Sequence, residues 1–346
     1  VFAFALYDKD NDLIFFARDT FGIRPLFIGT QNNDNHLLFS SVLKCFIPLE
    51  KYGTINAKQI TPGSYCSYKL NQYNEWECLE FCKSFINIPI VNNRLLDFDD
   101  VNKIIYDSLT LAVKKRIDNT DRPIACLLSG GLDSSLITAL VKKNLPENVE
   151  LHTWSIGFEG SEDLFYAQLV ADFLHTNHHS IVVKEQDFLD AIPDVIEAIE
   201  SYDTTTVRAS VGNWLISKYI KENSDAKVVF NGDGSDEVAG GYMYFHCAPN
   251  EIEFDKEARR LLKDIHFFDV LRSDRSISSH GLEARTPFLD VTFVQNYLSI
   301  PQSFRFSCHK NGCEKYLIRN AFEVSKLLPK EVKPNTKYMF WREIEF

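Results

Sequence analysis

Residues 123–135 constrain the fold of this chain more than any other stretch. They are Pro-Ile-Ala-Cys-Leu-Leu-Ser-Gly-Gly-Leu-Asp-Ser-Ser, an apolar run and a serine–glycine turn, after which apolar residues recur at helical spacing. A buried strand, a tight turn and a helix in that order leave free backbone N–H groups at the helix N-terminus, where an anion is favoured. The stretch therefore predicts a phosphate site, with an ordinary strand-to-helix turn as the alternative.

An acidic residue in this turn indicates a metal ion beside the phosphate. The turn has no lysine, so it is not the Gly-x4-Gly-Lys phosphate loop, and Asp133 stands in it instead. A carboxylate repels phosphate unless a divalent cation lies between them. A second apolar strand runs into another glycine-rich turn, Asn231-Gly232-Asp233-Gly234-Ser235-Asp236-Glu237. Because Mg²⁺ prefers a few carboxylates together with phosphate oxygens, the two turns predict a site for magnesium and triphosphate. For the second turn alone, a solvated acidic turn is the alternative.

Strands and helices alternate around these two turns. A helix begins near Asp99, its expected N-cap, and the pattern beyond residue 240 is mainly helical. This alternation predicts an α/β doubly wound parallel sheet that binds its ligand at the carboxyl ends of the strands. The expected strands are 124–128, 151–156, 180–183 and 227–230, and the expected helices are 134–144, 163–174, 187–200 and 210–222.

The first eighty residues have a different, β-rich pattern. Residues 83–97 lack periodicity and contain Pro89, so we place a linker there. The chain is thus divided into a β-rich domain at residues 1–82, a linker at 83–97 and an α/β domain at 98–346. The strands expected in the β-rich domain are 1–6, 13–17, 37–41, 63–70 and 76–81.

Composition narrows the range of partners. A net charge of −11 argues against a nucleic-acid partner, since nothing would offset phosphate repulsion over a broad face. No apolar run approaches the roughly 20 residues that cross a bilayer, so no membrane segment is expected. The eight cysteines are scattered along the chain, which favours a reducing cytoplasm over a disulfide scaffold.

Other groupings have the residue types of a metal site, and we interpret each as structural. The spacing Asp8-x-Asp10-x-Asp12 lacks the glycine and the glutamate of a calcium loop and predicts a hairpin turn. Histidines 175, 178 and 179 lie between a helix end and a strand, where the helix dipole suits them. The cysteine pairs Cys78/Cys82 and Cys308/Cys313 do not have the usual two-residue spacing of zinc ligands.

Taken together, motifs along nearly the whole chain resemble the glutamine-hydrolysing asparagine synthetase family, which joins a class II glutamine amidotransferase to an ATP pyrophosphatase of the PP-loop type. The resemblance implies an adenine nucleotide α-hydrolase-like α/β domain, preceded by part of an N-terminal-nucleophile glutaminase domain. The motifs are Ala17-Arg18-Asp19-Thr20-Phe21-Gly22, Ser129-Gly130-Gly131-Leu132-Asp133-Ser134, Ser155-Ile156-Gly157-Phe158, Thr204-Thr205-Thr206-Val207-Arg208, the turn at 231–237 and Gly281-Leu282-Glu283-Ala284-Arg285-Thr286-Pro287.

The resemblance also implies a reaction. In this family MgATP adenylates the side-chain carboxylate of aspartate, and ammonia released from glutamine attacks the β-aspartyl-AMP. The products are asparagine, AMP and pyrophosphate. The expected ligands are therefore ATP, Mg²⁺, aspartate, and glutamine or ammonia, and a homodimer is one assembly that the resemblance leaves open.

Site residues follow from the resemblance position by position. Asp233, Arg208 and Thr205 would be catalytic. Asp133 and Asp236 would hold Mg²⁺, and Asp19 would bind the amino group of glutamine. The residues implied to bind the nucleotide are Leu127, Ser129, Gly130, Gly131, Asp133, Ser134, Ile156, Asn231 and Gly232.

Three of the departures from the family's pattern bear on activity. None of the eight cysteines stands where the family has its nucleophile. Asp233 stands in place of a glutamate, and its shorter side chain puts the adenylation step in question. Residues 333–336 stand where the family has a segment with a catalytic lysine. An ATP-binding pseudoenzyme and a synthetase that adenylates another carboxylate, as β-lactam synthetases do, are therefore the alternatives to asparagine synthesis.

Overall fold

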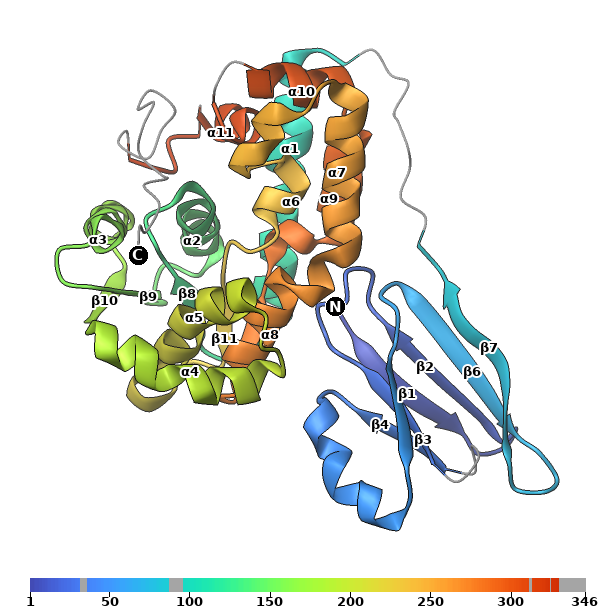
Figure 1. Ribbon diagram of the computed structural model, residues 1–346. Helices are drawn as coiled ribbons and strands as arrows, with labels where there is room; N and C mark the ends of the chain where they lie inside the picture. The colour runs from blue at the N-terminus through green and yellow to red at the C-terminus, as the bar shows by residue number, and fades with distance from the viewer. Residues whose placement is uncertain (32–35, 87–95, 311–312, 324, 330–346) are drawn as a thin grey trace.

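The chain folds into two parts, a β-rich part that ends at residue 86 and an α/β part that begins at residue 96 (Figure 1). The computed structural model describes residues 1–31, 36–86, 96–310, 313–323 and 325–329, and only the backbone of residues 307–310. The last strand of the β-rich part continues to Ser84, two residues into the predicted linker, and the first helix after it begins at Phe98. Residues 87–95 of that linker lie outside the described residues.

Two antiparallel sheets pack face to face in the β-rich part. Their strand orders are β1-β2-β6-β7 and β4-β3-β5. Phe16, Ile28, Phe39 and Cys66, one from each of four strands, meet in the core between the sheets. The strands are β1 (Ala3–Asp8), β2 (Leu13–Arg18), β3 (Phe27–Gln31), β4 (His36–Ser40), β5 (Ile55–Gln59), β6 (Ser64–Leu70) and β7 (Trp76–Ser84). Two 3₁₀ helices, η1 (Leu43–Cys45) and η2 (Ile47–Tyr52), lie between β4 and β5.

Sequence reasoning missed β3 and β5. The strand β5 is at the edge of its sheet, and its three central residues are exposed, so it carries no alternation of apolar and polar side chains. The strand β3 lies between β4 and β5 and has a glycine at its centre, where a Cβ would lie 2.9 Å from the Ile55 side chain. Pairing with neighbouring strands, rather than the local pattern, makes both segments extended.

The α/β part contains a five-stranded sheet in the order β10-β9-β8-β11-β12, and every neighbouring pair is parallel. The chain passes from β8 outward to β9 and β10, and then returns to the other side of β8 for β11 and β12. Strand order therefore reverses between β8 and β11, the place where such sheets bind ligands. The strands are β8 (Ile124–Leu127), β9 (His152–Gly157), β10 (Asn177–Val182), β11 (Val228–Phe230) and β12 (Glu283–Arg285).

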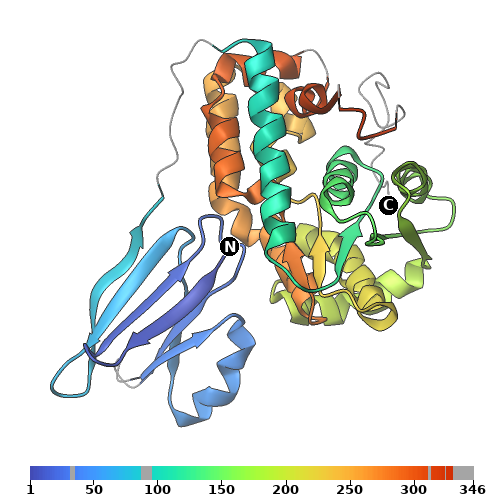
Figure 2. The ribbon, with the colours of Figure 1, turned by 180° about the vertical axis from the view of Figure 1, so that it is seen from behind.

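Helices cover both faces of this sheet, which confirms the doubly wound fold. Cys126 of β8 faces a core shared with α1, α2 and α3, whereas Ala125 faces a core shared with α5 and α8. Figure 2 shows α1 running beside α9, and the two helices are in contact. The helices are α1 (Phe98–Asp118), α2 (Leu132–Asn144), α3 (Glu162–Leu174), α4 (Glu185–Ile199), α5 (Thr204–Asn223), α6 (Ser235–Ala239), α7 (Glu251–Asp264), α8 (Asp269–Ser278), α9 (Val291–Ser299), α10 (Gln302–Lys310) and α11 (Tyr316–Glu323).

Several boundaries in the α/β part differ from the sequence prediction, two of them for a local reason, and one strand there was not predicted. The N-cap of α1 is Asp97, whose carboxylate accepts a hydrogen bond of 2.8 Å from the Asp100 N–H, and not Asp99. Helix α5 begins at Thr204 rather than at 210, because the Asp203 side chain caps a run of threonines that by itself does not favour a helix. Strand β12 has only three residues, too few for a period to be read.

The aspartates at 8–12 and the histidine cluster, whose residue types could suit a metal site, make structural contacts instead. Residues 8–12 form the turn of the β1–β2 hairpin. The two ring nitrogens of His178 lie 3.0 Å from the hydroxyls of Thr153 and Ser155, and burial lowers the pKa of His178 to about 4. Within the described ranges, no group of three or more histidine, cysteine or acidic residues is arranged to hold a metal. No helix among them has the length and apolar character needed to span a bilayer.

The two parts of the molecule meet at a polar interface centred on Glu200, the residue that ends α4. Its carboxylate accepts hydrogen bonds from the backbone N–H groups of Leu43 (2.9 Å) and Lys44 (2.7 Å) at the start of η1. The buried guanidinium of Arg275 in α8 lies 3.3 Å from the same carboxylate. Beside it, Arg24 of the β-rich part forms an ion pair with Asp274 of α8. One carboxylate thus joins α4, α8 and the β-rich part.

We expect Glu200→Ala to lower the free energy of unfolding by about 2 kcal/mol, because it leaves a buried guanidinium and two N–H groups without their acceptor. The control is Glu197→Ala on the same helix, whose carboxylate is 78% exposed and lies 3.6 Å from the Lys44 ammonium. It should cost less than about 0.5 kcal/mol. Urea denaturation measures both values, and hydrogen exchange should accelerate at the Leu43 and Lys44 amides in the first variant only. Equal losses in the two variants would contradict this account.

Candidate phosphate and cation site

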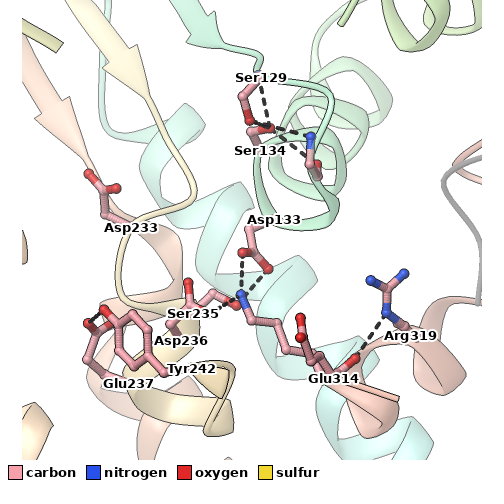
Figure 3. Close-up of polar contacts among 12 residues, drawn as sticks. Ser129, Asp133, Ser134, Asp233, Ser235, Asp236, Glu237, Tyr242, Glu314 and Arg319 are labelled. Carbon is pink, nitrogen blue, oxygen red and sulfur yellow. Dashed lines mark hydrogen bonds and ion pairs between the residues drawn. The ribbon is translucent and has the colours of Figure 1, made fainter. Parts of the chain in front are cut away.

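Hydrogen bonds between Ser129 and Ser134 fix the turn that joins β8 to the N-terminus of α2. The Ser129 N–H donates a hydrogen bond of 3.2 Å to the Ser134 Oγ, and the two hydroxyls lie 3.0 Å apart (Figure 3). Gly130 has a φ of +80°, and a Cβ there would lie 2.6 Å from the backbone N of Ala167, so the turn requires glycine. No side chain in the described part of the chain caps the first turn of α2. Backbone N–H groups and hydroxyls therefore gather where an anion is favoured.

The turn after β11 packs directly against this first turn. A Cβ on Gly232 would lie 2.8 Å from the Asp133 Cβ and 2.9 Å from the Ser134 N, so no other residue allows this approach. The Ser235 hydroxyl, at the start of α6, donates a hydrogen bond of 2.8 Å to Asp133 Oδ1. The two turns that the sequence singled out therefore form one site.

The carboxylates of Asp133 and Asp236 converge on a single cation, the ammonium of Lys315. Its Nζ lies 2.5 Å from Asp133 Oδ2 and 2.7 Å from Asp236 Oδ1 (Figure 3). Burial alone would lower the pKa of Lys315, but the two carboxylates raise it above its ordinary value, so the side chain is charged. Sequence reasoning missed Lys315, since no motif surrounds it and it lies far along the chain, just before α11.

Asp233, the predicted catalytic acid, lies apart from this ion pair and has partners of its own. The Arg272 guanidinium is 3.2 Å from Asp233 Oδ1, and the Asn231 amide donates a hydrogen bond of 2.7 Å to Asp233 Oδ2. Asn231 is itself held by the Ser273 hydroxyl at 2.6 Å. The carboxylate is therefore fixed in direction by α8, and Figure 3 shows it to one side of the Asp133 carboxylate.

The end of the acidic turn is anchored in the core. Glu237 is fully buried and accepts a hydrogen bond from the Tyr242 hydroxyl. Burial and the nearby Asp269 carboxylate raise the pKa of Glu237 well above its ordinary value. The third acid of the turn is thus a structural group and does not face the converging pair.

Leu127 and Ile156, two of the residues predicted to bind the nucleotide, lie on one face of the sheet. Leu127 of β8 is opposite Trp154 of β9, and Ile156 follows two residues later, so all three side chains share that face. Both predicted residues are partly buried and pack against the Trp154 cluster. They border the carboxyl ends of the two strands that flank the first turn.

Thr205 and Arg208, two of the predicted catalytic residues, lie outside the two turns. Thr205 and Arg208 are exposed in the first turns of α5, and α5 reaches the sheet through Val207, which packs in a cluster with Ile156. Within the described part of the chain, no hydrogen bond or ion pair joins Thr205 or Arg208 to either turn. Residues 333–336 lie outside that part.

Asp19 is in the β-rich part. Its carboxylate accepts hydrogen bonds from the backbone N–H groups of Phe21 (3.2 Å), Ile23 (3.0 Å) and Arg24 (2.9 Å), and its residue is 5% exposed. It borders a cavity of about 180 Å³ between the two parts of the molecule, lined also by Arg116 and Asp290. This cavity is distinct from the site at the two turns.

A parallel sheet whose switch point brings together a serine–glycine turn and an acidic turn defines a phosphate-binding α/β protein. Comparison with known proteins gives the family. Residues 105–255 and 248–343 match the model of the family described as Asparagine synthase, and residues 1–48 match the Glutamine amidotransferase domain. The chain belongs to the asparagine synthase family.

Curated relatives agree with the family match. The chain is 42% identical over 357 residues to the glutamine-hydrolyzing asparagine synthetase of Homo sapiens, with 98% of this chain and 63% of the relative covered. It is 42% identical over 355 residues to that of Gallus gallus, with the same coverage. The chain thus spans 63% of the length of these relatives. An NH3-dependent NAD synthetase from Campylobacter jejuni is similar at 22% identity and a TM-score of 0.29, covering 49% of this chain and 75% of its own, which is too distant to bear on the site.

Gly232→Ala should separate the two turns, because its Cβ would meet backbone and Cβ atoms that cannot move aside. We expect a loss of about 1–3 kcal/mol in the free energy of unfolding and faster hydrogen exchange at residues 129–134. Gly212→Ala is the matched control, since the nearest atom to its Cβ, in Phe188, is 3.9 Å away and Gly212 lies inside α5. It should leave stability unchanged or raise it by up to about 1 kcal/mol. An equal effect of both substitutions would show that the close approach is unimportant.

Proposed function

We propose that the α/β part of this chain converts L-aspartate to L-asparagine, using ATP to adenylate the side-chain carboxylate and releasing AMP and pyrophosphate. The observation that carries the proposal is the convergence of Asp133 and Asp236 beside the donor-rich turn, in a chain of the asparagine synthase family. The names of the curated relatives support the same reaction. The nitrogen would come from ammonia or from glutamine.

The phosphate end of ATP would lie on the turn at residues 129–134. The hydroxyls of Ser129 and Ser134 and the N–H groups of Gly130, Gly131 and the first turn of α2 would donate to its oxygens. Asn231 and Gly232 form the opposite wall, and Leu127 and Ile156 would contact the adenine.

Asp133 and Asp236 suit Mg²⁺. Their oxygens already converge within 2.5–2.7 Å of one cationic atom, and hard carboxylate oxygens completed by phosphate oxygens are the usual ligands of this ion. When bound, Mg²⁺ neutralises phosphate charge and favours departure of pyrophosphate. The chain's own contribution is to fix the two carboxylates at the strand ends, through the Ser235 hydrogen bond and the Gly232 contact.

The remaining residues have proposed roles toward substrate. Arg208 and Thr205, exposed at the start of α5, would bind the phosphate and the acyl group of β-aspartyl-AMP. Asp233 would act at the adenylation step, with Arg272 and Asn231 as its positioning residues. Asp19 would bind the amino group of glutamine, since three N–H groups leave part of an ionised carboxylate's acceptor capacity free.

We also propose a cytoplasmic location. Seven cysteines in the described residues are free thiols, and both buried and exposed ones occur among them. Thiols in this state favour a reducing compartment.

The proposed reaction is tested by pyrophosphate release and asparagine formation from L-aspartate and MgATP, with ammonium in one arm and glutamine in the other. Product in the ammonium arm supports the proposal. Nucleotide binding without aspartate-dependent pyrophosphate would contradict it in favour of the pseudoenzyme. Turnover with a different carboxylate alone would favour a synthetase of the β-lactam type.

Asp133→Asn should lower kcat by about 100-fold, because it removes one charge from the pair that faces the phosphates. Asp118→Asn is the control, since that carboxylate is 57% exposed and, among the described residues, pairs with Lys114 alone, at the end of α1. It should leave the rate of pyrophosphate release unchanged. A similar rate of pyrophosphate release in both variants would contradict the role proposed for Asp133.

A further inference from the structure

We propose that the Lys315 ammonium prevents free divalent cations from binding to Asp133 and Asp236. A metal ion then binds only together with a phosphate ligand, which attracts the ammonium away from the two carboxylates. This inference rests on the proposed role of the two aspartates as metal ligands. It goes beyond that role by stating that the phosphate ligand and the metal bind together, and that Lys315 imposes this order.

The ammonium stands where a metal ion would have to be. Its Nζ is 2.5 and 2.7 Å from one oxygen of each aspartate, and Mg²⁺ would bind the same oxygens at about 2.0–2.1 Å. Two cations cannot share that point, since they would overlap and repel each other at short range in a buried site. Metal and ammonium therefore exclude each other at this pair.

The Lys315 side chain fills a space that is left by a glycine, Gly241. A Cβ on Gly241 would lie 2.2 Å from the Lys315 Cε and 2.1 Å from Asp236 Oδ1, so the glycine provides the space that the stem and carboxylate fill. The Lys315 residue is 8% exposed. Its φ is +54°, in the left-handed region that a lysine rarely adopts, which is the kind of strain found at functional positions. These features distinguish Lys315 from a surface lysine that meets two acids by chance.

The net charge at the Asp133–Asp236 pair determines whether the Lys315 ammonium or a divalent metal ion occupies it. The two carboxylates with the ammonium carry a net charge of −1, so a divalent cation gains little unless the ammonium leaves, and a buried ammonium without an anion is strongly disfavoured. A phosphate ligand on the turn at residues 129–134 would supply that anion next to Asp133. The ammonium then has a second partner, and the carboxylates become free for the metal.

The test uses Mn²⁺ alone as probe, in the full chain without nucleotide, measured by calorimetry and by the paramagnetic resonance signal of free Mn²⁺. Lys315→Met and Lys315→Gln should bind Mn²⁺ about tenfold or more tightly than the unchanged chain. Adding Asp236→Asn to either variant should abolish the gain. The matched control is Lys256→Met, at a 66% exposed lysine paired with Glu253, which should leave Mn²⁺ affinity unchanged.

Unaltered Mn²⁺ affinity in both Lys315 variants, or a gain that survives Asp236→Asn, would overturn the proposal. If a variant does not fold without metal, it should fold when millimolar Mn²⁺ is present, because the metal replaces the missing charge. Failure of Mn²⁺ to restore the fold would also overturn it. None of these measurements uses aspartate or turnover, so a failure of the proposed reaction would be seen separately.

Discussion

Three segments of the α/β part are joined by one ammonium between two carboxylates. Asp133 comes from the N-terminus of α2, Asp236 from α6, and Lys315 from the residue before α11. Without the lysine, two partly buried carboxylates would face each other, and their repulsion would oppose the close approach of the turns through Gly232. The geometry of the site therefore depends on this ion pair as much as on the sheet. The sheet sets where the turns emerge, and the ammonium sets how near they come.

The second polar centre, at Glu200, relates this site to the β-rich part. Glu200 ends α4, and α5 begins at Thr204, so the same short connection that contacts η1 also positions the first turn of α5. Arg275, its partner in α8, is three residues from Arg272, which holds Asp233. Residues proposed to act on substrate are thus anchored to helices that also contact the other part of the molecule.

Much of this arrangement could be predicted from the sequence, and the failures have physical reasons. The turns at 129–134 and 231–237 were found because glycine and small polar residues after an apolar strand constrain the backbone locally. Ordered strands and helices then placed both turns at one edge of a parallel sheet. Lys315, Arg272 and Ser235 were missed as contacts because each reaches the site through tertiary packing, and β5 and β12 because pairing rather than pattern makes them strands. The start of α5 was also mispredicted, because the Asp203 cap extends this helix across three threonines that by themselves do not favour it.

The distances along the chain between these partners bear on how the molecule folds. Asp133 and Ser235 are 102 positions apart, whereas Asp133 and Lys315 are 182 apart. Because closing a longer loop costs more entropy, contact between the two turns should precede docking of the lysine. Synthesis from the N-terminus acts in the same direction. A nascent chain would carry a complete acidic pair before its own counter-ion exists, and small cations from solution would be the first to neutralise it.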